Sequence, residues 1–215
     1  RSFEKAGLLT RLGCQYHWFN RNYENFDHFL SALTSKKRKQ IKRERRRVSE
    51  QNIQIEVLVG DEIMGEHWEV FHKFYCSTFY RKWGEPRLTE AFFRTLNDRL
   101  PGAPMLLLAK TLGKYIAGAF ALINGDTLYG RHWGCSAGHD SLHFELCYYQ
   151  TIDYCIRHGF RRLDAGAQGE HKLARGFVPV STWSTHWIQD SGLRRAVNDF
   201  VTRERVALEQ YMNEL

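Results

Sequence analysis

The chain has 215 residues, 43% of them hydrophobic and 14% aromatic, and it carries a formal net charge of +7. This composition excludes a disordered chain, and the length is enough for one large domain with a hydrophobic core. No apolar run approaches the ~20 residues that a membrane-spanning helix needs, so we expect no membrane span.

The N-terminal residues and the cysteines bear on where the protein resides. The first residues, RSFEKAGLLTR, lack both Met and an apolar signal segment, so we expect a fragment or a processed form. The five cysteines are odd in number and include no CxxC pair. This usage favours a reducing compartment, and we expect a cytoplasmic protein without a disulfide framework.

Positive charge is concentrated in one segment. Residues 36–47, KKRKQIKRERRR, hold nine Lys or Arg and one Glu, a charge of +8, so the rest of the chain carries about −1. The sequence therefore indicates a nearly neutral body with one basic segment.

The N-terminal half predicts strands separated by helices. Residues 7–20 mix apolar, polar and aromatic side chains and indicate a strand. Apolar residues recur at roughly helical spacing over residues 25–49, which predicts one long helix. Residues 53–60 alternate and predict a second strand, and two further helices are expected over residues 65–83 and 88–100.

The C-terminal half predicts a meander followed by a crossover helix. Residues 105–134 should form three consecutive antiparallel strands, because Leu112-Gly113-Lys114 and Asn124-Gly125-Asp126 are typical of tight hairpin turns. A helix over residues 140–160 then leads into a strand over residues 161–166, which should lie parallel to the strand at 127–134. The remaining elements are a strand over 177–190 and a closing helix over 191–215. We therefore expect an α/β fold in which helices cover a mixed sheet.

Three long segments resemble one protein family. They are QYHWFNRNYENFDHFLSALTSKKRKQIKRERRRV, FYRKWGEPRLTEAFF and YGRHWGCSAGHDSLHFELCYYQTIDYCIRHGFRRLDAGAQGEHKLARGF. Together they resemble the FemAB-like "peptidoglycan biosynthesis/recognition" family of predicted N-acyltransferases in the GNAT superfamily. The resemblance implies a GNAT-like fold, with a mostly antiparallel sheet, flanking helices and one parallel strand pair at the cleft. It also implies that residues 1–215 form a single GNAT-like domain, the C-terminal part of a longer chain with tandem GNAT-like halves.

The resemblance further implies transfer of an acyl or aminoacyl group to an amine acceptor. Ordinary GNAT enzymes bind the acyl-CoA pyrophosphate on a Q/R-x-x-G-x-G/A loop before a helix. Here that place reads CSAGHDSLHFE, residues 135–145, in which only Gly138 fits. This departure argues against acyl-CoA and favours aminoacyl-tRNA, the donor of Fem-type ligases and of leucyl/phenylalanyl-tRNA transferases. No cofactor is indicated with certainty, and either acyl-CoA or aminoacyl-tRNA would enter as the donor substrate. We expect no metal, because the sequence has no HExxH pattern and this fold's chemistry needs none.

The basic segment has two interpretations. Nine cations on one helix repel one another unless an anionic partner neutralises them, so the segment is a candidate for binding tRNA, another nucleic acid or a diphosphate. The alternative is a solvated helix, and a nuclear localisation signal has a similar composition. The candidate binding residues are Lys36, Lys37, Arg38, Lys39, Lys42 and Arg43. The second function that we consider is a non-catalytic module that binds nucleic acid or a cell-wall precursor through this segment.

Candidate catalytic residues lie after two strands that are expected to be parallel neighbours. His143 and Glu145 open the helix that follows the strand at 127–134, and Glu170 and His171 follow the strand at 161–166. The carboxyl ends of adjacent parallel strands splay, so we expect these four side chains to share one cleft. Glu145 or His143 can accept the proton of an attacking amine, and Glu170 is expected to orient His171 for the same task.

Further residues are expected to contact the substrate. Lys172 and Arg175 are candidates for holding a phosphate or carboxylate. The other candidate substrate-binding residues are Arg131, His132, Tyr149 and Gln168. The structural alternatives are an exposed charged loop at residues 169–176 and a helix start capped by Asp140 or Ser141, with His143 packed in the core.

Overall fold

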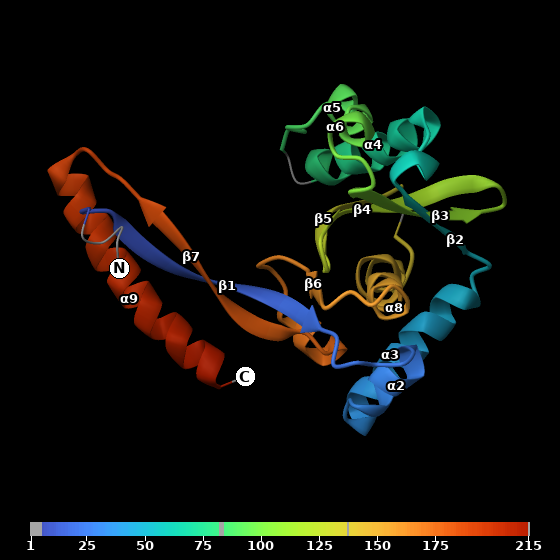
Figure 1. Ribbon diagram of the computed structural model, residues 1–215, viewed down its shortest axis with the longest axis horizontal. Helices are drawn as coiled ribbons and strands as arrows, with labels where there is room; N and C mark the ends of the chain where they lie inside the picture. Colours follow the sequence, from blue (N-terminus) through green and yellow to red (C-terminus); the bar gives the residue numbers. More distant parts are fainter. Residues whose placement is uncertain (1–5, 82–83, 137, 215) are drawn as a thin grey trace.

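The computed structural model describes residues 6–81, 84–136 and 138–214, and they build one mixed sheet with helices on both faces (Figure 1). The strands follow the order β2-β3-β4-β5-β6-β1-β7 across the sheet. Their bounds are β1 Leu9–Phe19, β2 Gln54–Val59, β3 Pro104–Thr111, β4 Lys114–Asn124, β5 Thr127–Cys135, β6 Arg162–Asp164 and β7 Val178–His186.

The meander and the crossover are confirmed. Strands β3, β4 and β5 pair antiparallel, and the turns between them place Gly113 and Gly125 at positive φ, where glycine is favoured. Strands β5 and β6 pair in parallel, with Thr127 opposite Arg162 and Tyr129 opposite Asp164. The mixed α/β class inferred from the order of elements is therefore the observed one.

Two helical layers enclose the sheet. The helices are α2 Phe26–Ser31, α3 Ser35–Ser49, α4 Gly65–Tyr80, α5 Glu90–Arg94, α6 Leu96–Arg99, α7 Leu142–Phe144, α8 Gln150–Arg157 and α9 Ser191–Asn213. In Figure 1, α4, α5 and α6 lie on one face of the sheet, and α2, α3 and α8 on the other. Alternating side chains of β3 divide the core accordingly: Leu106 and Leu108 pack with Trp68 and Phe71 of α4, whereas Leu107 packs on the α8 side.

Three predicted helices are divided or shortened. The expected helix over 25–49 consists of α2 and α3, because Asn25 and Thr34 each accept a backbone N–H and start a separate helix. The helix over 88–100 is likewise divided into α5 and α6. The helix expected over 65–83 is α4, which ends at Tyr80; residues 82 and 83 lie outside the described part of the chain.

The helix expected over 140–160 has a composite structure. It comprises α7, the π-helical segment Glu145–Tyr149 and α8. A π-helical turn amounts to one extra residue within an α-helix and is frequent at functional sites. The segment therefore changes which side chains face the sheet.

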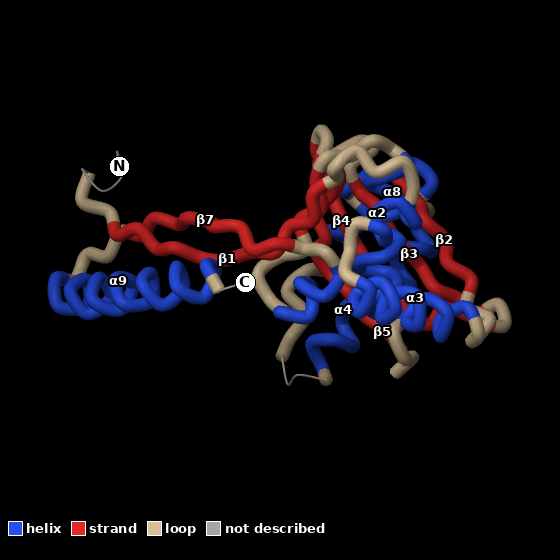
Figure 2. Tube along the Cα trace, turned by 90° about the horizontal axis from the view of Figure 1, so that it is seen from below, coloured by secondary structure: helices blue, strands red, loops and turns tan. Residues whose placement is uncertain are grey.

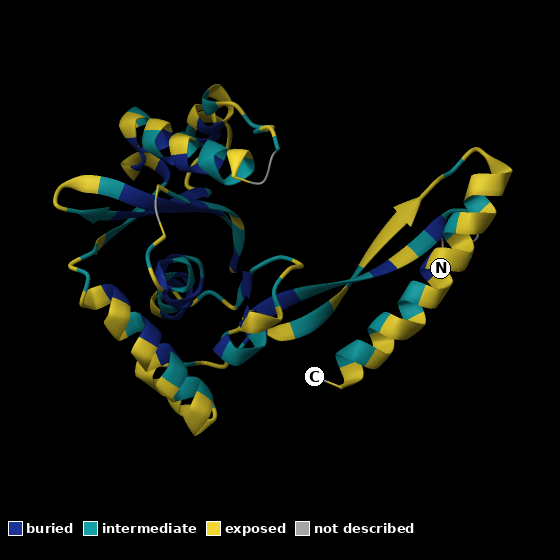
Figure 3. Ribbon diagram, turned by 180° about the vertical axis from the view of Figure 1, so that it is seen from behind, coloured by how far each residue is buried: buried dark blue, intermediate teal, exposed yellow. Residues whose placement is uncertain are grey.

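Strands β1 and β7 form a ribbon that projects from the sheet. They pair from Leu9 opposite His186 to His17 opposite Val178, and only the end of β1 reaches β6. Helix α9 packs against this ribbon, and the two form an arm beside the body in Figures 1 and 2. Figure 3 shows that most of α9 is exposed. Among the described helices, none combines the length and the apolar character that crossing a membrane would require.

Candidate active site

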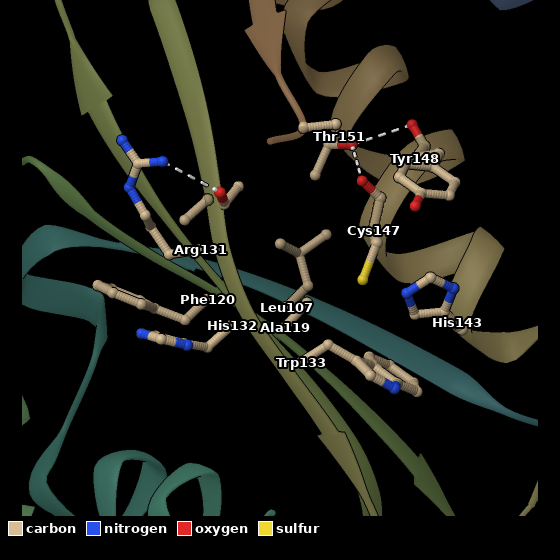
Figure 4. A pocket seen from close by; sticks show the side chains of 13 residues that line it. Leu107, Ala119, Phe120, Arg131, His132, Trp133, His143, Cys147, Tyr148 and Thr151 are labelled. Atoms are coloured by element: carbon tan, nitrogen blue, oxygen red, sulfur yellow. Dashed lines mark hydrogen bonds between the residues drawn. The ribbon is translucent and has the colours of Figure 1, made fainter. Parts of the chain in front are cut away.

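A cleft opens where β5 and β6 separate. The two strands pair only from Thr127 to Tyr129 of β5, and β6 ends at Asp164. Just beyond, β5 carries a β-bulge: Phe120 of β4 lies opposite His132, the adjacent Ala121 lies opposite Gly130, and Arg131 is the extra residue. The cleft has a volume of about 130 Å³ and is lined by Leu107, Ala119, Phe120, Ala121, Gly130, Arg131, His132, Trp133, His143, Cys147, Tyr148, Thr151 and Ala165 (Figure 4).

Arg131 and His132, the two predicted substrate-binding residues at the bulge of β5, lie on the side of the cleft away from His143 (Figure 4). His132 stacks on Phe120, with 8° between the ring planes, and contacts Tyr75 of α4. The exposed Arg131 lies over the Tyr129 ring, with 5.1 Å from Cζ to the ring centroid. In Figure 4, Trp133 points toward His143, whereas the His132 ring lies beside Phe120.

The structure brings His143 and His171 together. Their ring centroids lie 6.3 Å apart, and the Tyr148 hydroxyl and His171 Nε2 are within hydrogen-bonding distance at 3.0 Å. Burial, aided by the positive charges of His171, Arg175 and Lys172, lowers the pKa of His143 to about 4. The pKa of His171 is also lowered, by partial desolvation and by the charges of Arg175 and Lys172, although the residue as a whole is exposed. Both imidazoles are therefore neutral near pH 7, the form that accepts a proton.

His171 is placed by a glycine. It belongs to the 3₁₀ helix η3, Glu170–Arg175, which begins after Gly169 at φ +101°. A Cβ at position 169 would lie 2.3 Å from Cε1 of His171. The imidazole folds back over Gly169, so the glycine both permits the backbone angle and makes room for the ring.

Glu170 does not take the position expected for it. Its carboxylate is exposed and accepts a hydrogen bond at 3.1 Å from the Tyr211 hydroxyl of α9. Successive residues of a 3₁₀ helix point about 120° apart, so Glu170 faces the arm while His171 faces Tyr148. Tyr148, rather than Glu170, is the hydrogen-bond partner of His171.

Glu145 also lies apart from His143. It is only 4% exposed, and its Oε1 accepts hydrogen bonds from Arg45 Nε at 3.3 Å and Gln150 Nε2 at 2.8 Å. Two residues along a helix correspond to a rotation of about 200°, so Glu145 faces α3 while His143 faces the cleft. The four expected catalytic residues thus divide, with the two histidines together and the two carboxylates elsewhere.

Arg175 and Tyr149 are occupied by a buried network. Arg175, 2% exposed, donates from Nη2 to both oxygens of Glu44, at 2.8 and 2.9 Å, and from Nε to the Tyr149 hydroxyl at 2.9 Å. The Tyr149 hydroxyl donates to Glu44 in turn. These contacts fix α3 to η3 and leave neither side chain exposed to a substrate anion, contrary to expectation.

Lys172 is a buried cation behind the cleft. Its Nζ donates to the carbonyl oxygens of Ala165 at 2.5 Å and Gly166 at 3.3 Å. Burial lowers its pKa, although nearby Asp164 opposes the shift. Since Ala165 lines the cleft, Lys172 holds the end of β6 in place. Gln168, by contrast, is exposed on the loop that precedes η3.

The basic segment forms α3 and presents most of its cations outward. Ile41, Glu44 and Val48 make up its buried stripe. Lys37 and Arg38 are half-buried. The other predicted cations, together with Gln40 and Arg46, line a shallow groove: Lys36, Lys39, Lys42 and Arg43.

Sequence reasoning missed Tyr148, Cys147, Thr151, Trp133 and Glu44. The first three face the cleft: Cys147 and Tyr148 belong to the π-helical segment, and Thr151 lies in the first turn of α8 directly after it. An inserted helical residue has no distinct sequence pattern. Glu44 did carry a signal. It is the only acid among the nine cations, and it follows Ile41 by three residues, on the apolar face.

Comparisons with known proteins place the chain. It matches the FemAB-like family, described as peptidoglycan biosynthesis/recognition, over residues 1–215. No curated protein matches. One similar solved structure is FemX, with 13% identity, a TM-score of 0.61 and coverage of 86% of this chain and 64% of that one. Another is L-PGS from Bacillus licheniformis, with 11% identity, a TM-score of 0.53 and coverage of 75% of this chain and 47% of that one.

Another similar structure is the C-terminal domain (DUF2156) of a putative lysylphosphatidylglycerol synthetase from Agrobacterium fabrum. It is 11% identical, with a TM-score of 0.55 and coverage of 80% of this chain and 52% of that one. The chain thus spans between about half and two thirds of these three proteins, and at such low identity the likeness concerns the fold. The family match, which extends over the full sequence, assigns the chain to the FemAB-like family.

Proposed function

We propose that the protein transfers an acyl or aminoacyl group to an amine in the cleft between β5 and β6. The observation that carries this proposal is the pair of neutral imidazoles, His143 and His171, beside the Tyr148 hydroxyl. An amine that attacks a carbonyl must lose a proton, and a neutral imidazole within reach can accept it.

The balance of the reaction matches these groups. The amine nitrogen forms a bond to the donor's carbonyl carbon, and the bond from that carbon to the leaving oxygen or sulfur breaks. A proton passes from the nitrogen to His143 or His171 and then to the leaving group. The positive charge of Lys172, held behind Ala165, favours the negative charge that develops on the carbonyl oxygen.

We propose aminoacyl-tRNA as the donor. The relevant loop is residues 135–145, of which the structure describes all but residue 137. In this loop the Asp140 carboxylate forms an ion pair with Arg47 of α3 at 2.7 Å, just before α7 begins. Because Arg47 is engaged by Asp140, the loop presents an ion pair rather than an available cation to a pyrophosphate, which disfavours acyl-CoA. The outward cations of α3 offer a surface for the phosphates of tRNA instead.

The family description and the name of one similar structure support a proposal for the class of acceptor. The family is described by peptidoglycan biosynthesis and recognition, and one similar structure is a putative lysylphosphatidylglycerol synthetase. We propose a cell-wall or lipid precursor as acceptor, in the cytoplasm, where the five free cysteines are compatible with reducing conditions.

The test is transfer of radiolabel from a mixture of aminoacyl-tRNAs to a UDP-linked muropeptide that carries a free amine. The wild-type protein should transfer label, and His171→Ala should reduce turnover by roughly 10²-fold. Glu69→Gln, on α4, is the matched control and should transfer normally. Equal transfer by the wild type and His171→Ala would refute the role of the imidazole.

The second candidate is a binding module without catalysis, which the basic groove of α3 favours. It predicts tight, salt-dependent tRNA binding without transfer of label from any donor. The same assay therefore separates the two functions.

A further inference from the structure

A second pocket lies on the opposite side of the helix that carries His143. It occupies about 480 Å³ between the end of α3, the start of β2 and the π-helical segment. Its lining comprises Arg45, Arg46, Val48, Ser49, Ile53, Ile55, Glu145 and Gln150. None of these residues lines the cleft between β5 and β6.

Glu145, which lines this pocket, has one carboxylate oxygen without a hydrogen-bond partner among the described residues. Oε1 accepts from Arg45 and Gln150, whereas Oε2 is buried and has no hydrogen-bond partner among the residues that the structure describes. Leaving a buried carboxylate oxygen without a donor is unfavourable. A donor from outside the described residues can complete this carboxylate, and an ammonium group is a strong one.

The rest of the pocket presents cationic side chains and an apolar wall, which suit an anionic group and an apolar group of a ligand. Arg45 lies over the Phe26 ring, at 4.4 Å to its centroid, and its Nε donates to Glu145. Its two terminal nitrogens have no hydrogen-bond partner in the described part of the chain, and they can meet an anion. Arg46 stands at the exposed rim, where it pairs with Glu50 at 3.5 Å. Between these charges lies an aliphatic wall made of Val48, Ile53 and Ile55.

We infer that this pocket binds a zwitterion with an aliphatic side chain, of the class of a free α-amino acid. Its ammonium group donates to the carboxylate of Glu145, its own carboxylate meets the guanidinium of Arg45, and its side chain packs on Ile53 and Ile55. The charged lining residues, Arg45, Arg46 and Glu145, sum to +1, and Glu50, which pairs with Arg46 outside the lining, balances this charge, which suits a ligand without net charge. The inference stands apart from the chemistry proposed for the cleft.

Three probes of the same shape test the assignment by calorimetry. L-leucine carries both charged groups, 3-methylbutan-1-amine lacks the carboxylate, and 4-methylpentanoate lacks the ammonium group. Leucine should bind at least about ten-fold more tightly than either relative, because each charged hydrogen bond is lost in one of them. Equal affinity for leucine and 4-methylpentanoate would overturn the inference.

Variants locate the site. Glu145→Gln should weaken leucine binding about ten-fold or more, whereas the remote Glu69→Gln should leave it unchanged. If Glu145→Gln does not fold, Ser49→Trp, an exposed change at the mouth, should block binding by occupying the pocket. Tyr148→Phe alters the cleft alone and should bind leucine normally. Normal leucine binding by Ser49→Trp, or its loss in Tyr148→Phe, would place the ligand elsewhere.

Discussion

Nη2 of Arg175 donates to both carboxylate oxygens of Glu44 in the core, although the two residues are 131 positions apart in the sequence. Glu44 is the single acid of the basic helix α3, and Arg175 closes η3 beside the cleft. The pair therefore connects the candidate tRNA-binding surface to the segment that carries His171.

Removing one partner of this pair should destabilise the protein strongly. Arg175→Met leaves the Glu44 carboxylate buried and unpaired, which costs about 3–5 kcal/mol in the free energy of unfolding. Urea denaturation measures the loss. The double variant Glu44→Leu/Arg175→Met should recover much of it, and Arg46→Met, which breaks an exposed pair, should change stability by less than about 1 kcal/mol. A double variant as unstable as Arg175→Met would contradict this view of the pair.

Acid should destabilise the fold through His143. Because its pKa is lowered to about 4 in the folded state, the unfolded chain binds more protons between about pH 4 and pH 6.5. The stabilisation that the fold gains from neutral His143 is therefore fully present above about pH 6.5. It is lost as the pH falls toward 4, and the loss from this group is at most about 3 kcal/mol. His143→Gln should flatten that part of the curve of unfolding free energy against pH. An unchanged slope would mean that His143 does not titrate in this way.

Acetyl-CoA should bind weakly or not at all. The loop at 135–145 lacks the second glycine, and because Arg47 is engaged by Asp140, it presents an ion pair rather than an available cation to a pyrophosphate. Calorimetry with acetyl-CoA provides the measurement, and Asp140→Asn should not weaken any residual affinity. Micromolar affinity for the wild type would show that the inference about the loop is mistaken.

The outward cations of α3 should account for RNA binding. Changing Lys36, Lys39, Lys42 and Arg43 to Gln should weaken tRNA binding and lower the slope of log affinity against log salt by roughly 0.7–0.9 for each lost phosphate contact. A control with Lys73 and Lys114 changed to Gln keeps the groove intact. Binding with the wild-type slope in the four-fold variant would mean that α3 is only a solvated helix.

Gly169→Ala should impair the cleft more than the fold. The added Cβ would clash with the His171 ring, and φ +101° is unfavourable for alanine. Turnover should fall by roughly 10-fold or more as the imidazole leaves Tyr148, while thermal unfolding still reports a cooperative protein. In the matched change Gly138→Ala the added Cβ would have no described atom within 4 Å outside its chain neighbours, so this change should be tolerated. Full turnover in Gly169→Ala would show that the position of His171 does not matter.

The elements read most accurately from the sequence are those set by local chemistry. Asn124-Gly125 fixes a hairpin by its own backbone preferences, and the β3–β5 meander follows from two such turns. The break between α2 and α3 also has a local signal, because Thr34 is a favoured N-cap residue and a weak helix former; the long helix predicted over residues 25–49 overlooks it.

The candidate site was predictable only where topology alone decides it. The parallel pairing of β5 and β6 brings His143 and His171 to the same edge of the sheet, and that follows from the order of elements. The direction of the Glu145 side chain depends on the π-helical segment, and the directions of Glu170 and Arg175 depend on the 3₁₀ helix η3. These helices differ from an α-helix only in the number of residues per turn, which the sequence pattern does not reveal. The contacts of β1 with β7 link residues more than 150 positions apart, beyond the reach of local patterns.

The π-helical segment has a consequence for how insertions and deletions act on this protein. Because it contains one more residue than an α-helix over the same length, deleting any one of residues 145–149 offers the chain a regular helix. The deletion would turn His143 about 100° relative to α8 and carry its imidazole away from His171. The cleft is therefore sensitive to the number of residues in this segment as well as to their identity, and a shortened relative would keep the sheet while losing the histidine pair.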